Sequence, residues 1–433
     1  MAEAIKLAVL GGSSVATPLL IQALIERPDC PPMQVVLVGR TDSKLRRVAA
    51  VCAGLAKGAS RPLQVAYTTD IASGLKGASY ILNQIRVGGY PARAYDETFP
   101  HAFGIPGEET VGPGGMNNAL RTIPVVLDAC RLIEQVAPHA LVINLTNPSS
   151  YIQYAIDRYT RVQVIGVCDS PVGMAAALAK LLGVSPGDLH MEYIGMHHFG
   201  WVTGVQLQSR DVMPLVMQHI EAYPGLPVDA RLVRAIGAVP SSYLKYYYHR
   251  DRELQKQRGQ PPRAQQLIEL EAEILADYES LSSSDLKTSG LPASGLPASV
   301  EKRGAGWYQG IIVPVLLAHA THTPRDFILN IRNGSQEDGA QRIAVPWLPA
   351  YAIIEIEVNV SGQGFHPRPA PAAPPDVQAM VRLNAACECL WVDAVVERSY
   401  DKALRAMVLN PLVQNLDQAA LILETIWPDD HPI

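Results

Sequence analysis

The sequence predicts an α/β fold in which a doubly wound parallel sheet is followed by an α+β part. Three observations support this prediction. Short apolar runs alternate with helical patterns early in the chain, the first apolar run ends in a glycine-rich turn, and the pattern changes after about Pro171. Strands that alternate with helical crossovers pair in parallel. We therefore divide the chain into residues 1–170 and residues 171–433.

The elements of the first part follow in order. The apolar run 5–10 is the first expected strand, and the apolar spacing between residues 19 and 24 indicates a helix after it. A second helix is expected over 42–55. The remaining buried strands are expected at 35–38, 65–67, 80–84, 141–144 and 164–167.

The second part has a different pattern. A helix is expected over 173–182 and a strand near Tyr193. The proline-rich run 366–375 reads as a stiff connector before a final helical segment. Two long helical stretches are expected at 233–249 and 263–278, and a flexible surface loop at 289–299.

The composition is that of an ordinary globular protein. Of the 433 residues, 48% are hydrophobic and 18% are charged, and the net charge is -5. These values give no reason to expect nucleic acid or an acidic membrane as a partner. We also expect no signal peptide and no membrane helix, because no apolar stretch reaches the roughly 20 residues that a span requires.

The six cysteines are too sparse for a disulfide framework in a chain of this length, which indicates a reducing cytoplasm. Cys387 and Cys389 could form a metal or redox pair. The helical spacing of apolar residues around them favours two small residues on a helix.

A candidate nucleotide-binding turn, Gly11-Gly12-Ser13-Ser14, follows the first strand. Glycine lets the backbone approach a pyrophosphate, and the next helix supplies N–H donors. The full G-x-G-x-x-G spacing is absent, so a tight turn without a cofactor stays open. Arg40 stands where an acidic residue would bind the ribose. It could meet a 2′-phosphate or stack on adenine, and we prefer NAD over NADP.

A candidate metal pair lies further along. Cys168 and Asp169 follow a predicted strand, at the sheet edge that faces the ligand crevice. His197 and His198 come about thirty residues later. A thiolate and an imidazole are both competent metal ligands. From spacing alone, a buried cysteine and a hydrogen-bonded core histidine remain the simpler interpretation.

Further motifs continue in the same order along the chain. They are Thr17-Pro18, the run Asn83 to Gly89, Arg93 with Asp96-Glu97, Gly107 to Gly115, Ala119 to Pro124, Asn144 to Pro148, the Cys168 turn, and the histidine turn that ends in Gly200-Trp201. Together they resemble glycoside hydrolase family 4, from residue 5 to at least residue 278. Within that family the chain looks most similar to the 6-phospho-β-glucosidases.

The resemblance implies a Rossmann-type NAD-binding domain joined to a C-terminal substrate and metal domain, as in lactate and malate dehydrogenases. It also implies an unusual glycosidase mechanism. NAD⁺ removes hydride from carbon 3 of the sugar, a base takes the acidified proton on carbon 2, and a divalent metal, usually Mn²⁺, stabilises the enediolate. The aglycone leaves from carbon 1, water adds, and the hydride returns. A homodimer or homotetramer is expected.

The resemblance assigns roles residue by residue. Cys168 and His198 match the metal ligands, and Tyr243 matches the catalytic base. A tyrosine base needs a lowered pKa, which a nearby cation could provide. The remaining matches are Asn83 at the cofactor, Asn147 at the sugar hydroxyls, Arg263 near the sugar phosphate, Arg93 as a second anion site, and Arg86 and Glu109 in the substrate-binding motifs.

Three positions depart from the family's pattern. Asp169 replaces a usual Asn and could be a general acid, as in some α-specific members, or a hydroxyl acceptor. His197 replaces an Asn and could be an extra metal ligand or a hydroxyl donor. Glu108 replaces a Gln and would disfavour a phosphate unless it pairs with Arg86 or Arg93. α-linked or non-phosphorylated substrates therefore stay open, and the thiolate would also suit Zn²⁺.

Two other functions compete with the glycosidase. An NAD-dependent 2-hydroxyacid dehydrogenase would share the N-terminal sheet, but it would need a His–Asp pair and no metal. A catalytically silent NAD sensor would bind the cofactor and cleave no glycoside. A glycosidase accumulates no net NADH during turnover, whereas a dehydrogenase does.

Overall fold

The computed structural model describes residues 5–59, 61–281, 295–337 and 340–428. Six parallel strands begin the main sheet in the order β3-β2-β1-β4-β5-β6. This order confirms the predicted doubly wound sheet, in which a crevice forms where the strand order reverses. The strands are β1 (Ile5–Leu10), β2 (Met33–Val38), β3 (Leu63–Thr68), β4 (Tyr80–Asn83), β5 (Leu141–Asn144) and β6 (Gln163–Gly166).

The same sheet continues beyond β6 with antiparallel strands, so it crosses the division expected at residue 170. β6 pairs with β11 through Gly166 and Asn330. The division into two domains stays a prediction. The added strands, in order away from β6, are β11 (Arg325–Arg332), β14 (Ile353–Ser361), β7 (Leu189–Met196), β8 (Phe199–Leu207) and β10 (Val239–Pro240), with β15 (Gly364–Pro367) on β14 and β9 (Arg210–Asp211) on β8; β12 (Gly334–Glu337) and β13 (Ala340–Ile343) form a separate pair.

Two hydrophobic cores lie on opposite faces of the sheet. In β1, Leu7 and Val9 belong to one core, while Ala8 and Leu10 belong to the other. This alternation follows from the two-residue period of a strand. One face is covered by α1 (Thr17–Ile25), α2 (Asp42–Ala56), α7 (Ser170–Leu182), α12 (Arg263–Ser280) and α15 (Val313–Ala320), and the other by α3 (Ile71–Leu75), α5 (Gly112–Val136), α6 (Ser149–Tyr159), α16 (Pro375–Glu397), α17 (Tyr400–Leu409) and α18 (Leu416–Ile426).

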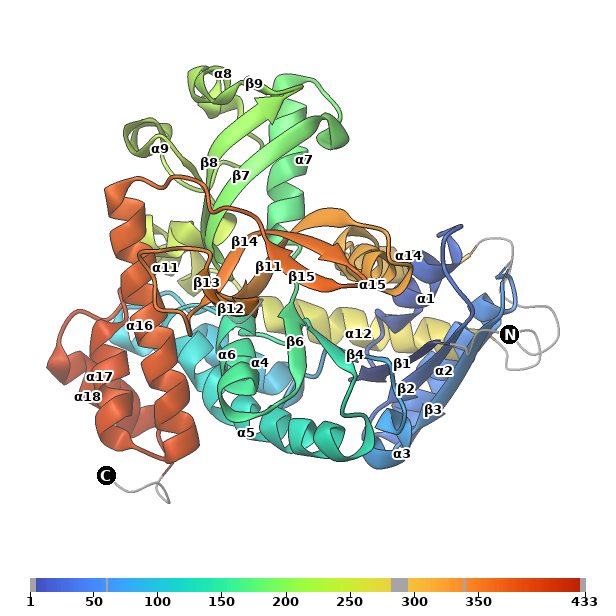
Figure 1. The fold of residues 1–433 in the computed structure, drawn as a ribbon. Helices are drawn as coiled ribbons and strands as arrows, with labels where there is room; N and C mark the ends of the chain where they lie inside the picture. The colour runs from blue at the N-terminus through green and yellow to red at the C-terminus, as the bar shows by residue number, and fades with distance from the viewer. Residues whose placement is uncertain (1–4, 60, 282–294, 338–339, 429–433) are drawn as a thin grey trace.

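Figure 1 shows the C-terminal helices α16 to α18 in red, beside α5 and α6. α16 carries Cys387 and Cys389 as buried residues, which confirms that they are helical. None of the helices in the described ranges is long and apolar enough to cross a membrane. The remaining helices are α4 (Gly89–Thr98), α8 (Met213–Gln218), α9 (Ala230–Ile236), α10 (Lys245–Tyr248), α11 (Arg250–Arg258) and α14 (Ala298–Arg303).

The long helix expected at 233–249 is wrong. α9 ends at Ile236, its C-cap residue Gly237 has a left-handed φ of 74°, and Pro240 then lies in the short strand β10. A 3-10 turn, Ser242–Leu244, and α10 follow. A left-handed glycine and a proline both interrupt a helix, whatever the apolar spacing around them. Most of the surface loop expected at 289–299 lies outside the described residues.

Candidate active site

Cys168, His197 and His198 form a buried cluster at one edge of the sheet. Cys168 lies two residues beyond β6, and the two histidines are the turn between β7 and β8. One ligand atom from each residue lies within 4.8 Å of the others. The sheet therefore brings together side chains that are about thirty residues apart in the sequence.

The histidine turn holds three aromatic rings in a stack. The rings of His197 and His198 are 3.8 Å apart between centroids, and His198 lies 3.6 Å from Tyr243 at an interplanar angle of 7°. His198 has a φ of 60°. This left-handed conformation costs a non-glycine residue about 1–2 kcal/mol, and such strain is concentrated at functional sites.

Hydrogen bonds determine which nitrogen of His198 carries the ring hydrogen. Glu108 Oε2 accepts the backbone N–H of Thr110 at 2.5 Å and also accepts the Thr110 hydroxyl. The Thr110 oxygen, 2.9 Å from His198 Nδ1, is then free to accept that ring N–H. His198 Nε2 keeps its lone pair, as a metal ligand must.

The donor set fits a divalent metal ion. Burial lowers the pKa of His197 to about 3 and that of His198 well below its usual range, so both imidazoles are neutral. Neutral imidazole is the form that ligates metals. His197 Nδ1 is buried and has no hydrogen-bond partner within the described ranges. Sulfur and imidazole nitrogen together suit Mn²⁺ less than they suit Zn²⁺ or Co²⁺.

The surroundings of Tyr243 include several acidic groups. Burial raises the pKa of its hydroxyl well above the usual range, and the negative groups of Glu108, Cys168 and Asp169 raise it further. The groups that act most strongly on Tyr243 in the described ranges all raise its pKa, so the lowering that a nearby cation could provide stays a prediction. A divalent ion would act in the opposite direction to these groups. Asp169 is the N-cap residue of α7, and burial raises the pKa of its carboxyl too.

Two of the predicted substrate-binding arginines are already paired. Arg86 and Arg93 both contact Glu109, and Arg93 Nε lies 2.7 Å from Glu97 Oε1. Although burial opposes it, the two arginines lower the pKa of Glu109. Arg263 begins α12, is exposed, and donates to Gln266 at 2.6 Å. Within the described part of the chain, Arg263 makes no ion pair.

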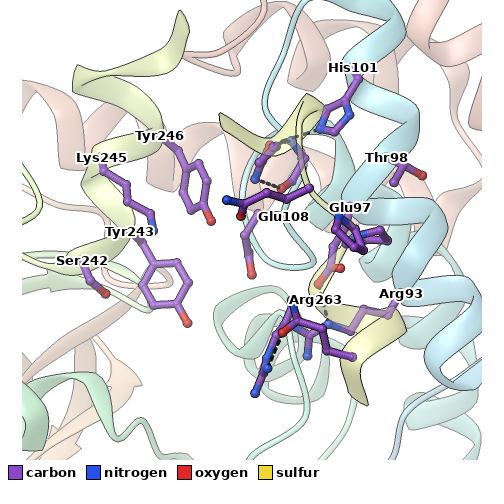
Figure 2. A pocket seen from close by; sticks show the side chains of 16 residues that line it. Arg93, Glu97, Thr98, His101, Glu108, Ser242, Tyr243, Lys245, Tyr246 and Arg263 are labelled. Atoms are coloured by element: carbon purple, nitrogen blue, oxygen red, sulfur yellow. Dashed lines mark hydrogen bonds and ion pairs between the residues drawn. The ribbon is translucent and has the colours of Figure 1, made fainter. Parts of the chain in front are cut away.

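A cavity of about 420 Å³ lies between these groups, and Figure 2 shows Tyr243 and Tyr246 on one side of it, with Arg93 and Arg263 on the other. The cavity thus connects the candidate base Tyr243 to Arg263, which makes no ion pair with the described residues. The other lining residues are Glu97, Thr98, His101, Gly107, Glu108, Ser242, Lys245, Gln257, Gln260, Pro261, Pro262 and Gln266.

The predicted nucleotide turn, Gly11 to Ser14, connects β1 to α1. Gly11 has a φ of 81°, and a Cβ on it would lie 2.7 Å from the carbonyl oxygen of Gln84. Asn83, at the carboxyl end of β4, is buried, and its Oδ1 has no partner among the described residues. A glycine turn and an unpaired acceptor at the crevice fit a dinucleotide. Arg40 lies beyond β2, exposed and without an ion pair to the described residues.

Two further residues of the site were not predicted from the sequence. Thr110 contacts both Glu108 and His198. It lies within the motif Gly107 to Gly115, which is the signal that could have indicated it. Glu355 on β14 is buried 4.0 Å from His197 Nδ1 and accepts hydrogen bonds from Tyr193 and Asn330, both at 2.8 Å. Nothing in the alternating pattern of β14 distinguishes Glu355.

Curated relatives match nearly the whole chain. A probable 6-phospho-β-glucosidase of Bacillus subtilis (strain 168) is 28% identical over 98% of this chain and 96% of its own length. A maltose-6′-phosphate glucosidase of the same organism is 26% identical over 99% and 97%. The relatives thus include enzymes named for β-glucosides and for a maltose phosphate.

Solved structures share the fold. The 6-phospho-β-glucosidase of Thermotoga maritima, solved with manganese, NAD⁺ and glucose-6-phosphate, is 24% identical over 98% of this chain and 97% of that chain, with a TM-score of 0.86. Malate dehydrogenase of Plasmodium falciparum is 11% identical over 92% and 99%, with a TM-score of 0.53. The expected likeness to malate and lactate dehydrogenases is therefore confirmed at the level of fold.

Two family models match the chain in order. The family 4 glycosyl hydrolase model covers residues 6–184, and the family 4 glycosyl hydrolase C-terminal domain covers residues 193–413. Together they span most of the sequence, and the matched ranges include Cys168, His198 and Tyr243. The protein therefore belongs to family 4 of the glycosyl hydrolases.

Proposed function

We propose that this enzyme hydrolyses the O-glycosidic bond of 6-phosphoglucosides, by oxidation at carbon 3, proton abstraction at carbon 2, elimination, addition of water and re-reduction. The observation that carries the proposal is the stack of Tyr243 on His198. It sets a phenol between the buried thiol–imidazole cluster and the cavity. The curated relatives named as 6-phosphoglucosidases support the substrate class.

The bound groups would be held at two neighbouring places. Gly11, Gly12, Ser13, Ser14 and Asn83 would hold NAD, with Arg40 at its adenosine end. Cys168 and His198 would hold the divalent ion, Mn²⁺ or another. When bound, NAD would take and return a hydride at carbon 3, and the ion would stabilise the negative charge that develops on the sugar oxygens.

Within this arrangement, the protein moves two protons. Tyr243 would take the proton from carbon 2, since its ring is fixed against His198 and it lines the cavity. Asp169 would give a proton to the leaving oxygen. Burial raises the pKa of this carboxyl, which favours the protonated form that an acid needs.

Four side chains would hold the sugar, and Arg93 and Arg263 among them line the cavity. Arg263 would bind the 6-phosphate, because its guanidinium has no acidic partner in the described ranges. Arg86 and Arg93, each paired with Glu109, would contact the sugar as fixed pairs rather than as free cations. Asn147 would bind a sugar hydroxyl through its NH₂ group, since its oxygen already meets His197.

Glu108 need not repel the phosphate. It does not pair with either arginine; it accepts from Thr110 instead. Burial and the neighbouring Glu109 raise the pKa of Glu108, so its negative charge is reduced near neutral pH. A 6-phosphate is therefore compatible with this cavity.

The test is a panel of aryl α- and β-glucosides, with and without 6-phosphate, assayed with NAD⁺, Mn²⁺ and a thiol reductant. We expect cleavage of a phosphorylated substrate that requires both NAD⁺ and the metal, with no net NADH. Slower turnover or solvent exchange of a substrate deuterated at carbon 2 would support the proton abstraction. Cleavage that persists after EDTA treatment would overturn the metal requirement.

The α-linked phosphoglucosides are the second candidate. Asp169 is the residue that some α-specific family members carry, and one relative is a maltose-6′-phosphate glucosidase. The same panel separates the two linkages and tests non-phosphorylated sugars.

We also propose a homodimer or homotetramer, measured by light scattering, and a cytoplasmic location, in keeping with the six free cysteines.

A further inference from the structure

The position of His197 is that of a metal ligand. It shares the two-residue turn with His198, and the two rings lie face to face at 3.8 Å. Its ligand nitrogen lies within 4.8 Å of those of His198 and Cys168. The side chain of His197 is buried.

The hydrogen bond to Asn147 fixes the tautomer of His197. His197 Nε2 lies 2.9 Å from Asn147 Oδ1. A carboxamide oxygen only accepts hydrogen bonds, so Nε2 carries the ring hydrogen and donates it. Nδ1 is therefore the nitrogen with the lone pair, and it is the atom left to face the cluster.

Within the described part of the chain, that lone pair has no hydrogen-bond partner. His197 Nδ1 is buried without a hydrogen bond among the described residues. The nearest acid, Glu355 Oε1, is 4.0 Å away, which is too long for a hydrogen bond. A buried polar atom without a partner is unfavourable, so the position calls for a partner that accepts the lone pair.

The hydrogen bond to Asn147 also argues against the other role that the sequence left open for His197, that of a donor to a sugar hydroxyl. A donor to a sugar hydroxyl needs a free N–H, but the one ring hydrogen of His197 is already donated to Asn147. A hydroxyl could still donate to Nδ1. The proximity of Cys168 and His198 favours a cation there instead, since one ligand atom of each of the three residues lies within 4.8 Å of the others.

We propose that His197 is a third protein ligand, so that the site is a Cys–His–His set formed by Cys168, His197 and His198. The inference rests on the proposed metal dependence. Three protein ligands with an open position are typical of catalytic metal sites. Exchanging the family's usual Asn for an imidazole favours Co²⁺ and Zn²⁺ over Mn²⁺, because imidazole is the softer ligand.

The test uses metal-free, full-length protein titrated with Co²⁺. In the proton NMR spectrum of the Co²⁺ form, each coordinated imidazole gives one exchangeable, hyperfine-shifted N–H signal. Two such signals are expected, from His197 Nε2–H and His198 Nδ1–H. The variant His197→Asn should show one signal and bind Co²⁺ at least about tenfold more weakly.

The control is His190→Asn, which removes an exposed histidine on β7, the strand that precedes His197. It should keep both signals and the wild-type affinity. A single shifted N–H in the wild type would overturn the proposal, even if His197→Asn failed to fold. The proposal would also be overturned if the variant His197→Asn bound Co²⁺ with the wild-type affinity and kept the wild-type preference for Zn²⁺ over Mn²⁺. None of these readouts uses glycoside cleavage, so failure of the proposed function is seen separately.

Discussion

Replacing Glu388 with glutamine should remove a large pH-dependent loss of stability. Glu388 lies on α16 and is 5% exposed. Asn384 Nδ2 donates to its Oε1 at 2.8 Å. Burial raises the pKa of the Glu388 carboxyl from 4.5 to about 8, and the hydrogen bonds from Ser150 and Asn384 offset only part of this increase.

The magnitude follows from the two pKa values. The unfolded chain ionises this carboxyl near pH 4.5, and the folded chain ionises it near pH 8. Between these values the unfolded state releases a proton that the folded state keeps, so rising pH favours unfolding. The loss is about 1.4 kcal/mol per pH unit and about 5 kcal/mol in total. Below pH 4.5 the carboxyl is protonated in both states, and the loss is absent.

The assay is the free energy of urea unfolding, from about pH 5 to about pH 8, for the wild type and Glu388→Gln. The free energy of unfolding of the variant should rise relative to that of the wild type by about 1.4 kcal/mol per pH unit. Glu424→Gln, which changes an exposed carboxylate on α18, should follow the wild type. Parallel pH profiles for the wild type and Glu388→Gln would refute the reasoning.

Three further predictions concern the active site. Tyr243→Phe keeps the ring that stacks on His198. It should lower kcat about 10²- to 10⁴-fold, while NAD binding, measured by fluorescence titration, stays unchanged. Full activity of this variant would exclude Tyr243 as the base. Thr110→Val removes the hydroxyl between Glu108 and His198; it should weaken Mn²⁺ binding about 10- to 100-fold by calorimetry, whereas equal affinity would contradict its orienting role. Arg263→Gln should raise KM for a 6-phosphoglucoside about 10- to 100-fold and leave a non-phosphorylated substrate unaffected; an equal effect on both would argue against phosphate contact.

The sequence by itself determined the first part of the fold. Strands such as β1 and β4 are short apolar runs, and Gly11 marks the turn between β1 and α1. These signals are local, since periodicity and glycine act within a few residues. The order of the motifs also sufficed to identify the family, which the two family models confirm.

The sequence could not locate the break before Tyr243. Apolar spacing around 233–249 predicts one helix, but Gly237 and Pro240 divide it, and Tyr243 lies on a 3-10 turn instead. A short break changes the direction of every later side chain. The stack of Tyr243 on His198 therefore depends on a feature that the apolar pattern does not show.

The tertiary structure alone decided the electrostatics of the site. Thr110 meets His198 across 88 positions of the chain, and Glu355 reaches His197 from a strand that is inserted between β11 and β7. Burial sets the pKa directions of Cys168 and Tyr243, and burial depends on which distant elements cover a residue. Residue types fix which ligands are available, but only packing fixes which nitrogen of each histidine is left to bind a metal.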